Sequence, residues 1–210
     1  MLKNYFFISI LFIFVYGSSY SDGLSLYKQH KYSEALKQFE NAAKDNDNQA
    51  MYAIGIMYIN ADGVQKNPQK AFDWFKKAAK LGNIYAFNQL GNIYASGQIV
   101  PKDYKKALYW FEKAAKLGNS NAAYNLGYFY TGGLGVDADL KKALSWYEAS
   151  AKAGNINAQI NLGFMYIAGH GTKVNYKKAA YWINKAKNTG NQKANLIWNE
   201  FHLEDYMDKK

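Results

Sequence analysis

Small and aromatic residues recur in this sequence at a fixed spacing of 36 residues. The repeated positions are Ala50, Ala86, Ala122, Ala158 and Ala194; Gly55, Gly91, Gly127 and Gly163; Tyr58, Tyr94, Tyr130 and Tyr166; and Trp74, Trp110, Trp146 and Trp182. A fixed period of this length indicates a stack of like supersecondary units, because each unit can bury its apolar face only against its neighbours.

The segment 84–119 shows what one unit contains. Apolar residues at helical spacing predict a first helix over 85–95 and a second over 102–116, joined by a loop that contains a glycine and a proline. Gly118 follows the second helix, and Gly82, Gly154 and Gly190 follow the equivalent helices, where a left-handed cap is expected. Each unit is therefore predicted to be a pair of helices with a glycine stop.

Gly91 lies inside the first of these helices, where glycine costs about 1 kcal/mol relative to alanine. The same cost recurs in four units. We therefore expect a neighbouring side chain to pack closely against each of these glycines.

Stacking such pairs predicts an all-α fold, an α/α superhelix (a right-handed solenoid) of antiparallel helix pairs. Four units of 36 residues are visible, at 48–83, 84–119, 120–155 and 156–191. Residues 22–47 match half of a tetratricopeptide pattern and are expected to form an N-terminal half-unit. Residues 192–210 depart from the pattern and become acidic, which predicts a capping helix from Gln192 to Met207.

The first 21 residues have the features of a signal peptide. Lys3 is followed by an apolar and aromatic run from Tyr5 to Tyr16, and small residues then offer cleavage after Ser19 or Ser21. The run is shorter than a membrane-spanning helix requires. Cleavage would give a mature protein that is periplasmic or secreted; an uncleaved membrane anchor is the alternative.

The composition narrows the range of possible chemistry and partners. The chain contains no cysteine, which excludes disulfides, thiol nucleophiles and thiolate metal sites. The net charge is +10, but all 26 basic residues are lysine. Because arginine is the preferred reader of phosphates and base edges, its absence argues against a nucleic-acid partner.

The third unit carries a motif of fixed spacing. Its residues are Ala122, Leu126, Gly127, Tyr130, Gly133, Gly135 and Val136, followed by Lys142, Ala143, Trp146, Tyr147, Ser150, Ala151 and Gly154. This motif resembles the Sel-1-like repeat, a subgroup of the tetratricopeptide-like helical repeats, and the resemblance covers about 48–191. It implies an adaptor in protein complexes, and for exported bacterial members a role in the envelope or in host contact. Gln98 and Ile99 replace the usual Gly-x-Gly turn in one unit, and Ala61 replaces its first glycine in another.

By this resemblance, first-helix positions at −6, −3, +1 and +4 from the glycine line the concave face, and we call them the inner stripe. They are Gln49, Tyr52, Ile56 and Ile59; Tyr85, Asn88, Asn92 and Ala95; Asn121, Tyr124, Tyr128 and Thr131; and Asn157, Ile160, Phe164 and Ile167. The stripe carries no charge, and its aromatic and amide side chains suit an extended peptide. The predicted partner-binding groove comprises Tyr52, Ile56, Asn88, Asn92, Tyr124, Tyr128 and Phe164. The alternative is that Ile56, Ile160 and Phe164 simply pack against the next unit.

Lysines also recur at the 36-residue spacing. They form two columns, Lys70, Lys106, Lys142 and Lys178, and Lys44, Lys80, Lys116 and Lys152. A solvated outer face explains such columns, because neighbours about 10 Å apart repel by only about 0.4 kcal/mol in water. The alternative is that the lysine columns bind an anionic partner such as peptidoglycan, lipid headgroups or an acidic protein.

No arrangement of residues indicates catalysis, a cofactor or a metal. The three histidines lie in separate segments without metal spacing, and Asp137 and Asp139 do not continue into a calcium loop. Ser25 and Lys28 match the S-x-x-K motif of penicillin-recognising enzymes, but no K-T-G element follows. We therefore expect a non-enzymatic exported scaffold that binds a protein or peptide in its concave groove. A structural envelope protein using its lysine face is the second hypothesis, and a cell-wall hydrolase or regulator is the third.

Overall fold

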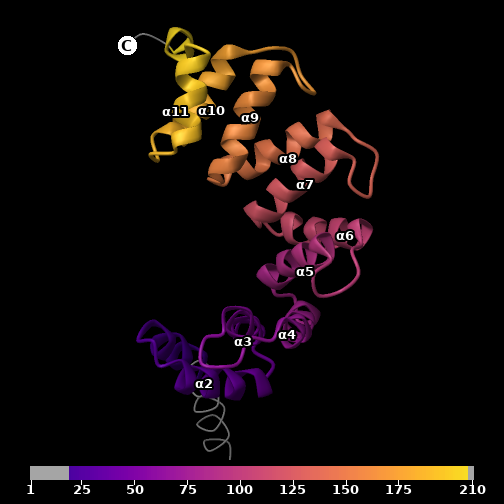
Figure 1. The fold of residues 1–210 in the computed structure, drawn as a ribbon, viewed down its shortest axis with the longest axis vertical. Coiled ribbons are helices and arrows are strands. Elements are labelled where there is room, and N and C mark those ends of the chain that lie inside the picture. The colour runs from indigo at the N-terminus through magenta and orange to yellow at the C-terminus, as the bar shows by residue number, and fades with distance from the viewer. Residues whose placement is uncertain (1–18, 208–210) are drawn as a thin grey trace, which may run out of the picture. The chain divides into compact units, whose positions relative to one another are not determined.

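The computed structural model describes residues 19–207, and every regular element in this range is helical. The chain divides into two compact halves, residues 1–101 and 102–210 (Figure 1). The N-terminal half contains a helical segment at 19–28, then α2 (Tyr32–Lys44), α3 (Asn48–Asn60), α4 (Pro68–Lys80) and α5 (Ile84–Ser96). The C-terminal half contains α6 (Tyr104–Lys116), α7 (Ser120–Gly132), α8 (Leu140–Lys152), α9 (Ile156–Ala168), α10 (Tyr176–Lys187), α11 (Gln192–Glu200) and the 3₁₀ turn η1 (Leu203–Tyr206).

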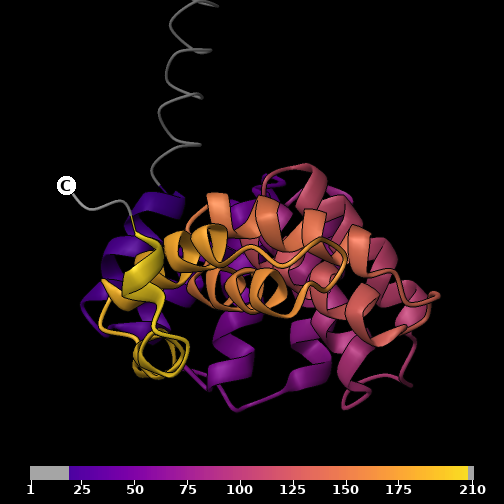
Figure 2. The same cartoon turned by 90° about the horizontal axis from the view of Figure 1, so that it is seen from above.

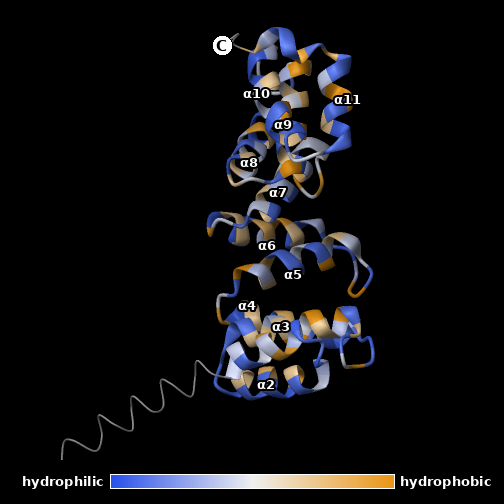
Figure 3. Cartoon of the chain, turned by 90° about the vertical axis from the view of Figure 1, so that its left-hand side faces the viewer, coloured by the Kyte–Doolittle hydropathy of each residue, from blue (hydrophilic) through white to orange (hydrophobic). Residues whose placement is uncertain are grey.

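Consecutive helices are packing neighbours within each half, from α2 to α5 and from α6 to α11. Figure 2 shows this arrangement for α9 and α10, which lie side by side. The predicted fold class, stacked α/α helix pairs, is confirmed. In Figure 3 apolar residues alternate with hydrophilic ones around the helices, as expected where one face of each helix is buried. Among the helices of residues 19–207, none has the length and apolar character to cross a membrane.

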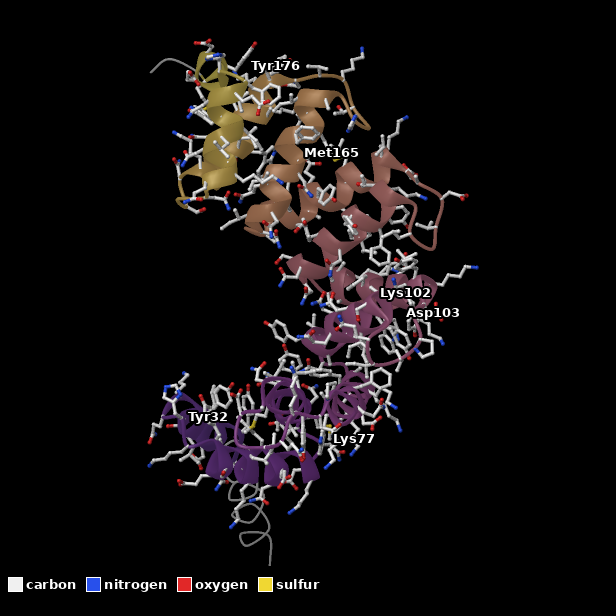
Figure 4. The ribbon with its side chains drawn as sticks, viewed as in Figure 1. Tyr32, Lys77, Lys102, Asp103, Met165 and Tyr176 are labelled. Carbon is white, nitrogen blue, oxygen red and sulfur yellow. The ribbon has the colours of Figure 1, made fainter. Side chains whose placement is uncertain are left out.

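Asparagine and aspartate side chains set the helix starts. The residues that cap the first helices are Asp47, Asn83, Asn119, Asn155 and Asn191, and those that cap the second helices are Asn67, Asp103, Asp139 and Asn175. Asp103 accepts a hydrogen bond of 2.9 Å from the backbone N–H of Lys106, which satisfies a helix donor that has no intrahelical partner. Helix α6 therefore begins at Tyr104, two residues after the predicted start at Lys102; Figure 4 marks Lys102 and Asp103 at this point.

Glycines end the second helices in the predicted conformation. Gly82 has φ +82° and Gly118 has φ +89°, and a Cβ added at either would meet nothing within 4 Å. Glycine is therefore needed there for its backbone angle alone. After α4 the Asn83 N–H bonds to the Ala78 carbonyl and the Gly82 N–H to that of Ala79, the two hydrogen bonds of a Schellman cap.

The glycines inside the first helices face large side chains of the second helices. A Cβ on Gly55 would lie 2.5 Å from the Phe75 ring, and a Cβ on Gly163 would lie 2.6 Å from Ile183. These distances are shorter than any carbon–carbon contact allows. The predicted close-packed neighbour is thus confirmed, and it is the core residue of the same helix pair.

The loop between the paired helices lies against the preceding pair. Gly63 approaches the backbone of Tyr32 at the start of α2, and Gly171 approaches that of Leu140 at the start of α8. Both have φ near +70°. Ile99 occupies the equivalent position in the second repeat without a positive φ, so that loop follows a different backbone path.

Residues 19–44 form a helix pair, where the sequence predicted only a half-unit. Gly23 faces Phe39 as the other glycines face their neighbours, with an added Cβ 2.7 Å from the ring. The connection between the helices is only residues 29–31, compared with 61–67 in the next pair. This shorter loop explains why the 36-residue pattern did not extend to the first pair. The predicted signal peptide lies outside the described residues as far as position 18.

The C-terminal cap is shorter than predicted. Helix α11 ends at Glu200 and not near Met207, because His202 takes a left-handed conformation with φ +47°. The chain then folds back as η1 and buries Leu203 completely. Tyr206 stacks on Tyr176 of α10 with 4.8 Å between ring centroids, at the end of the half where Figure 4 labels Tyr176.

Candidate partner-binding surface

In the N-terminal half, the predicted groove residues lie on α3 and α5. The Tyr52 ring lies 5.7 Å from the rings of both Phe75 and Tyr85, so its position is held from two sides. Ile56 and Asn88 are half-buried, and Asn92 is exposed. All of these side chains are therefore at least partly accessible on this half.

In the C-terminal half, the predicted groove residues lie on α7 and α9. Tyr124 is half-buried with its ring 5.7 Å from that of Tyr147. Tyr128 is 56% exposed and Phe164 is 47% exposed. Large aromatic side chains with this much exposed surface are well placed to contact a partner.

Two further positions of the inner stripe are buried. Ile160 and Ile167 keep only 3% and 7% of their surface exposed, because they belong to the core built by α8, α9, α10 and α11. The packing alternative therefore holds for Ile160. It does not hold for Phe164, which is exposed.

A contact that recurs along the chain fixes several tyrosines of the first helices. Three of them, each three residues before a helix glycine, pack on the core aromatic of the paired helix: Tyr20 on Phe39, Tyr52 on Phe75 and Tyr124 on Tyr147, each pair at 5.7 Å. Burial raises the pKa of the Tyr147 hydroxyl, opposed by hydrogen bonds with Thr131 and Asn161. Because these rings are already packed, a partner would lose little side-chain entropy in ordering them.

The first cavity on the stripe lies in the N-terminal half and has a volume of about 190 Å³. It is lined by Tyr20, Leu24, Tyr27, Phe39, Tyr52, Ala53 and Ile56. The first three of these residues are not among the groove residues predicted from the sequence. The signal was present, because they stand at −3, +1 and +4 from Gly23, but the segment had been assigned to a half-unit.

Tyr27, which lines this cavity, is held in place by a hydrogen bond to Asp62. Its hydroxyl donates a hydrogen bond of 2.5 Å to the carboxylate of Asp62, which follows α3. Burial and this hydrogen bond raise the pKa of Tyr27 to about 12. The bond links the segment 19–28 to the loop of the next repeat.

The second cavity lies in the C-terminal half and has a volume of about 300 Å³. It is formed where α9 meets α11 and is lined by Ile160, Asn161, Phe164, Lys193, Ile197, Glu200 and Phe201. Of the predicted groove residues it contains Phe164. The four α11 and cap residues were not predicted, because the last helix was interpreted as a cap only.

The lysines of the first column have local structural roles. Lys70, Lys142 and Lys178 lie over the rings of Tyr58, Tyr130 and Tyr166, with the amines 5.4, 5.4 and 5.1 Å from the ring centroids. Lys106 and Lys142 also pair with the capping carboxylates of Asp103 and Asp139 at 3.3 and 3.6 Å. Such contacts agree with a solvated outer face.

The residues that could have indicated catalysis are dispersed. Among residues 19–207 there is no cluster of three histidine, aspartate or glutamate side chains that could hold a metal ion. Ser25 accepts a hydrogen bond of 3.3 Å from the Gln29 side chain on the exposed surface of its own helix. The S-x-x-K match is therefore part of an ordinary helix surface.

Helix pairs with a crowded interior glycine, a glycine stop and a backward-reaching loop define the chain as an α/α repeat protein. The Sel1 repeat profile matches four times, at residues 48–83, 85–119, 120–155 and 156–191. The chain belongs to the Sel1 repeat family, whose members are generally scaffolds for protein interaction and typically non-enzymatic.

Solved structures agree with this assignment. A Sel1 repeat protein from Oxalobacter formigenes is 34% identical, with a TM-score of 0.80, over 85% of this chain and 75% of that one. The protein c5321, described as a protective antigen of uropathogenic Escherichia coli with an SLR fold, is 30% identical with a TM-score of 0.79. That match covers 85% of this chain but only 39% of c5321, so the present chain spans well under half of it. Cysteine rich protein B of Helicobacter pylori is 27% identical with a TM-score of 0.50, over 64% of this chain and 96% of that one. Among functionally curated proteins, none matches significantly.

Proposed function

We propose that this protein is an exported scaffold that binds a protein or peptide through its inner stripe, in a cell-envelope function or in host contact. One observation carries the proposal: the stripe presents uncharged aromatic and amide side chains, and two of its tyrosines, Tyr52 and Tyr124, are packed on core rings. Tyr128 and Phe164 are about half exposed, whereas Tyr124 is held against Tyr147. Rigid aromatic anchors of this kind dominate the binding free energy of protein interfaces.

Export is supported by the sequence and by one relative. The first 21 residues have the charge, length and small residues of a cleaved signal peptide. The E. coli relative is described as a protective antigen, which favours an accessible location for this chain as well. A periplasmic or secreted location is therefore part of the proposal.

A crosslinking pull-down from envelope extract tests the scaffold function. The bait is the purified protein with a C-terminal tag, beside the variants Asn92→Ala and Tyr128→Ala. Tyr109→Ala is the matched control, because Tyr109 is a tyrosine of α6 that lies off the stripe and is 52% exposed, close to the 56% of Tyr128. We expect one defined protein to be captured by the wild type and the control, and lost with Tyr128→Ala.

The second candidate is a structural envelope protein that associates with peptidoglycan or membrane through its lysines. The net charge of +10 favours it, although the first lysine column is already engaged with tyrosines and carboxylates. It predicts binding to sacculi that falls steeply with salt and is lost in a Lys106→Glu/Lys142→Glu variant. Capture of sacculi by wild type and Tyr128→Ala alike, with release by salt, would replace the scaffold proposal by this one.

A further inference from the structure

The cavity between α9 and α11 differs in charge from the rest of the inner stripe. Its apolar part comes from Ile160, Phe164 and Ile197, and its rim includes Lys193 and Glu200, both exposed. Asn199 occupies the glycine place of α11, so these two residues stand at −6 and +1, the stripe positions. The four complete repeats carry no charge at any stripe position. The only charges on the described stripe therefore coincide with a cavity.

Helix stability does not explain these two charges. A helix favours anions at its N-terminus and cations at its C-terminus, because its dipole is positive at the start and negative at the end. Lys193 is the second residue of α11 and Glu200 is the last, so both have the unfavourable sign. The second helices of the repeats show the favourable arrangement, with lysines such as Lys116 and Lys152 in the last turn.

Local pairing does not explain them either. Within residues 19–207, neither Lys193 nor Glu200 makes a hydrogen bond, ion pair or ring contact with another side chain. Lys193 and Glu200 are seven positions apart on α11, which corresponds to about 10.5 Å of helix rise. The cavity is thus flanked on one helix by a cation and an anion with no internal partner.

We propose that this cavity binds an extended peptide segment of a partner protein through three side chains. An apolar side chain enters between Phe164 and Ile197, a carboxylate meets Lys193, and a basic group meets Glu200. The proposal rests on the proposed scaffold function and specifies the partner chemistry at one end of the C-terminal half. In an extended peptide, side chains at i, i+2 and i+4 point to one face and span about 13 Å. Because charged side chains are long and flexible, this span can be adjusted to the distance of about 10.5 Å that separates Lys193 and Glu200 along α11.

Three labelled peptides with capped ends test this recognition: Asp-Ser-Leu-Ser-Lys, Asp-Ser-Leu-Ser-Asp and Lys-Ser-Leu-Ser-Lys. Their binding is measured by fluorescence polarisation and by amide shifts of α9 and α11 in NMR spectra. Comparing charge composition avoids assumptions about peptide direction. We expect the wild type to bind the mixed-charge peptide at least about threefold more tightly than either like-charged one, as two exposed ion pairs allow.

Charge-reversal variants provide the decisive comparison. Lys193→Glu should shift the preference to the dilysine peptide, and Glu200→Lys to the diaspartate peptide. The double variant Lys193→Glu/Glu200→Lys should restore the mixed-charge preference without lowering the unfolding temperature, since it gives α11 the favourable dipole arrangement. Lys105→Glu, at an exposed lysine of α6, lowers the net charge by the same two units as Lys193→Glu and should leave the preference unchanged. Phe164→Ala should weaken the binding of all three peptides.

The outcomes separate this inference from the scaffold function. A preference that none of the α11 variants alters, or no shift in α9 and α11 with millimolar peptide, overturns the inference. If a partner is captured and lost with Tyr128→Ala at the same time, the scaffold function stands without it. Concentration-dependent self-association abolished by Lys193→Glu would assign the cavity to a second copy of this chain and also overturn it. Peptide binding as expected, without any captured partner, would leave the site standing and remove the scaffold proposal.

Discussion

Gly127 of α7 lies directly against the ring of Tyr147 in α8, so close that a Cβ on the glycine would be 2.6 Å from the ring. The same ring supports Tyr124 on the inner stripe at 5.7 Å. One side chain therefore joins the close glycine contact of this helix pair to its candidate binding surface. A change that moves Tyr147 should affect both.

Gly127→Ala should destabilise the protein by about 1–3 kcal/mol, because the added methyl must displace the buried ring. Gly132→Ala in the same helix is the control. There the nearest atom is Leu134 Cγ at 3.5 Å, so alanine should be neutral or slightly stabilising. Chemical denaturation of the two variants makes the comparison, and equal effects would contradict the crowding argument.

Ala61→Gly should stabilise the protein by up to about 1 kcal/mol. Ala61 caps α3 with φ +68°, a left-handed conformation that strains an L-residue. The equivalent caps Gly97, Gly133 and Gly169 have φ values of 72°, 64° and 70°. The reciprocal change Gly133→Ala should lower the free energy of unfolding by a similar amount. Thermal unfolding midpoints that move in the same direction for both variants would rule this explanation out.

Tyr27 should ionise later than an ordinary tyrosine, since burial and the Asp62 hydrogen bond raise its pKa from 10.0 to about 12. The folded state holds the proton more tightly than the unfolded state. The resulting stabilisation is therefore complete below about pH 10 and is lost as the pH rises from 10 towards 12. NMR titration of ¹³Cζ-labelled tyrosine measures the pKa. Asp62→Asn should lower it towards 10, while Tyr147, in the other half, titrates as before.

If the proposed signal peptide is cleaved, the stability of the mature protein should depend on whether Tyr20 is kept. Its ring packs on Phe39 at 5.7 Å and lines the N-terminal cavity, so cleavage after Ser21 would remove it and cleavage after Ser19 would keep it. A chain beginning at Tyr20 should be more stable than one beginning at Asp22 by about 1 kcal/mol. Mass spectrometry of the mature protein identifies the cleaved bond, and denaturation compares the two chains. Equal stability would show that this ring adds nothing to the fold.

The repeat positions could be predicted from sequence because each has a single cause. Gly118 needs a left-handed backbone and Gly127 needs space, and both causes recur at a fixed spacing. The ends of the array were harder to predict from the sequence. The first helix pair has a shortened loop, and α11 is stopped by His202, a residue with no general preference for ending helices.

The candidate surface was predicted less completely than the fold. Helical periodicity indicates which residues share a face, but not what covers that face. Ile160 and Phe164 stand on the same stripe of α9, yet one is buried and the other exposed, because the C-terminal cap covers only part of the helix. The charges of Lys193 and Glu200 are visible in the sequence, and their meaning depends on a cavity that only the structure shows.

The backward-reaching loops have a consequence for how such a chain can grow. Gly171 meets the start of α8, and Gly63 meets the start of α2, so each of these two loops packs against the pair before it. A duplicated repeat inserted between two such pairs would bring its own loop, and the start of the second helix in the preceding pair would offer that loop the same contact. A pair added ahead of residues 19–44 would meet only the short connection 29–31, and helix packing alone would have to hold it. A pair added on the N-terminal side of the first pair would therefore gain fewer stabilising contacts than one inserted between existing pairs.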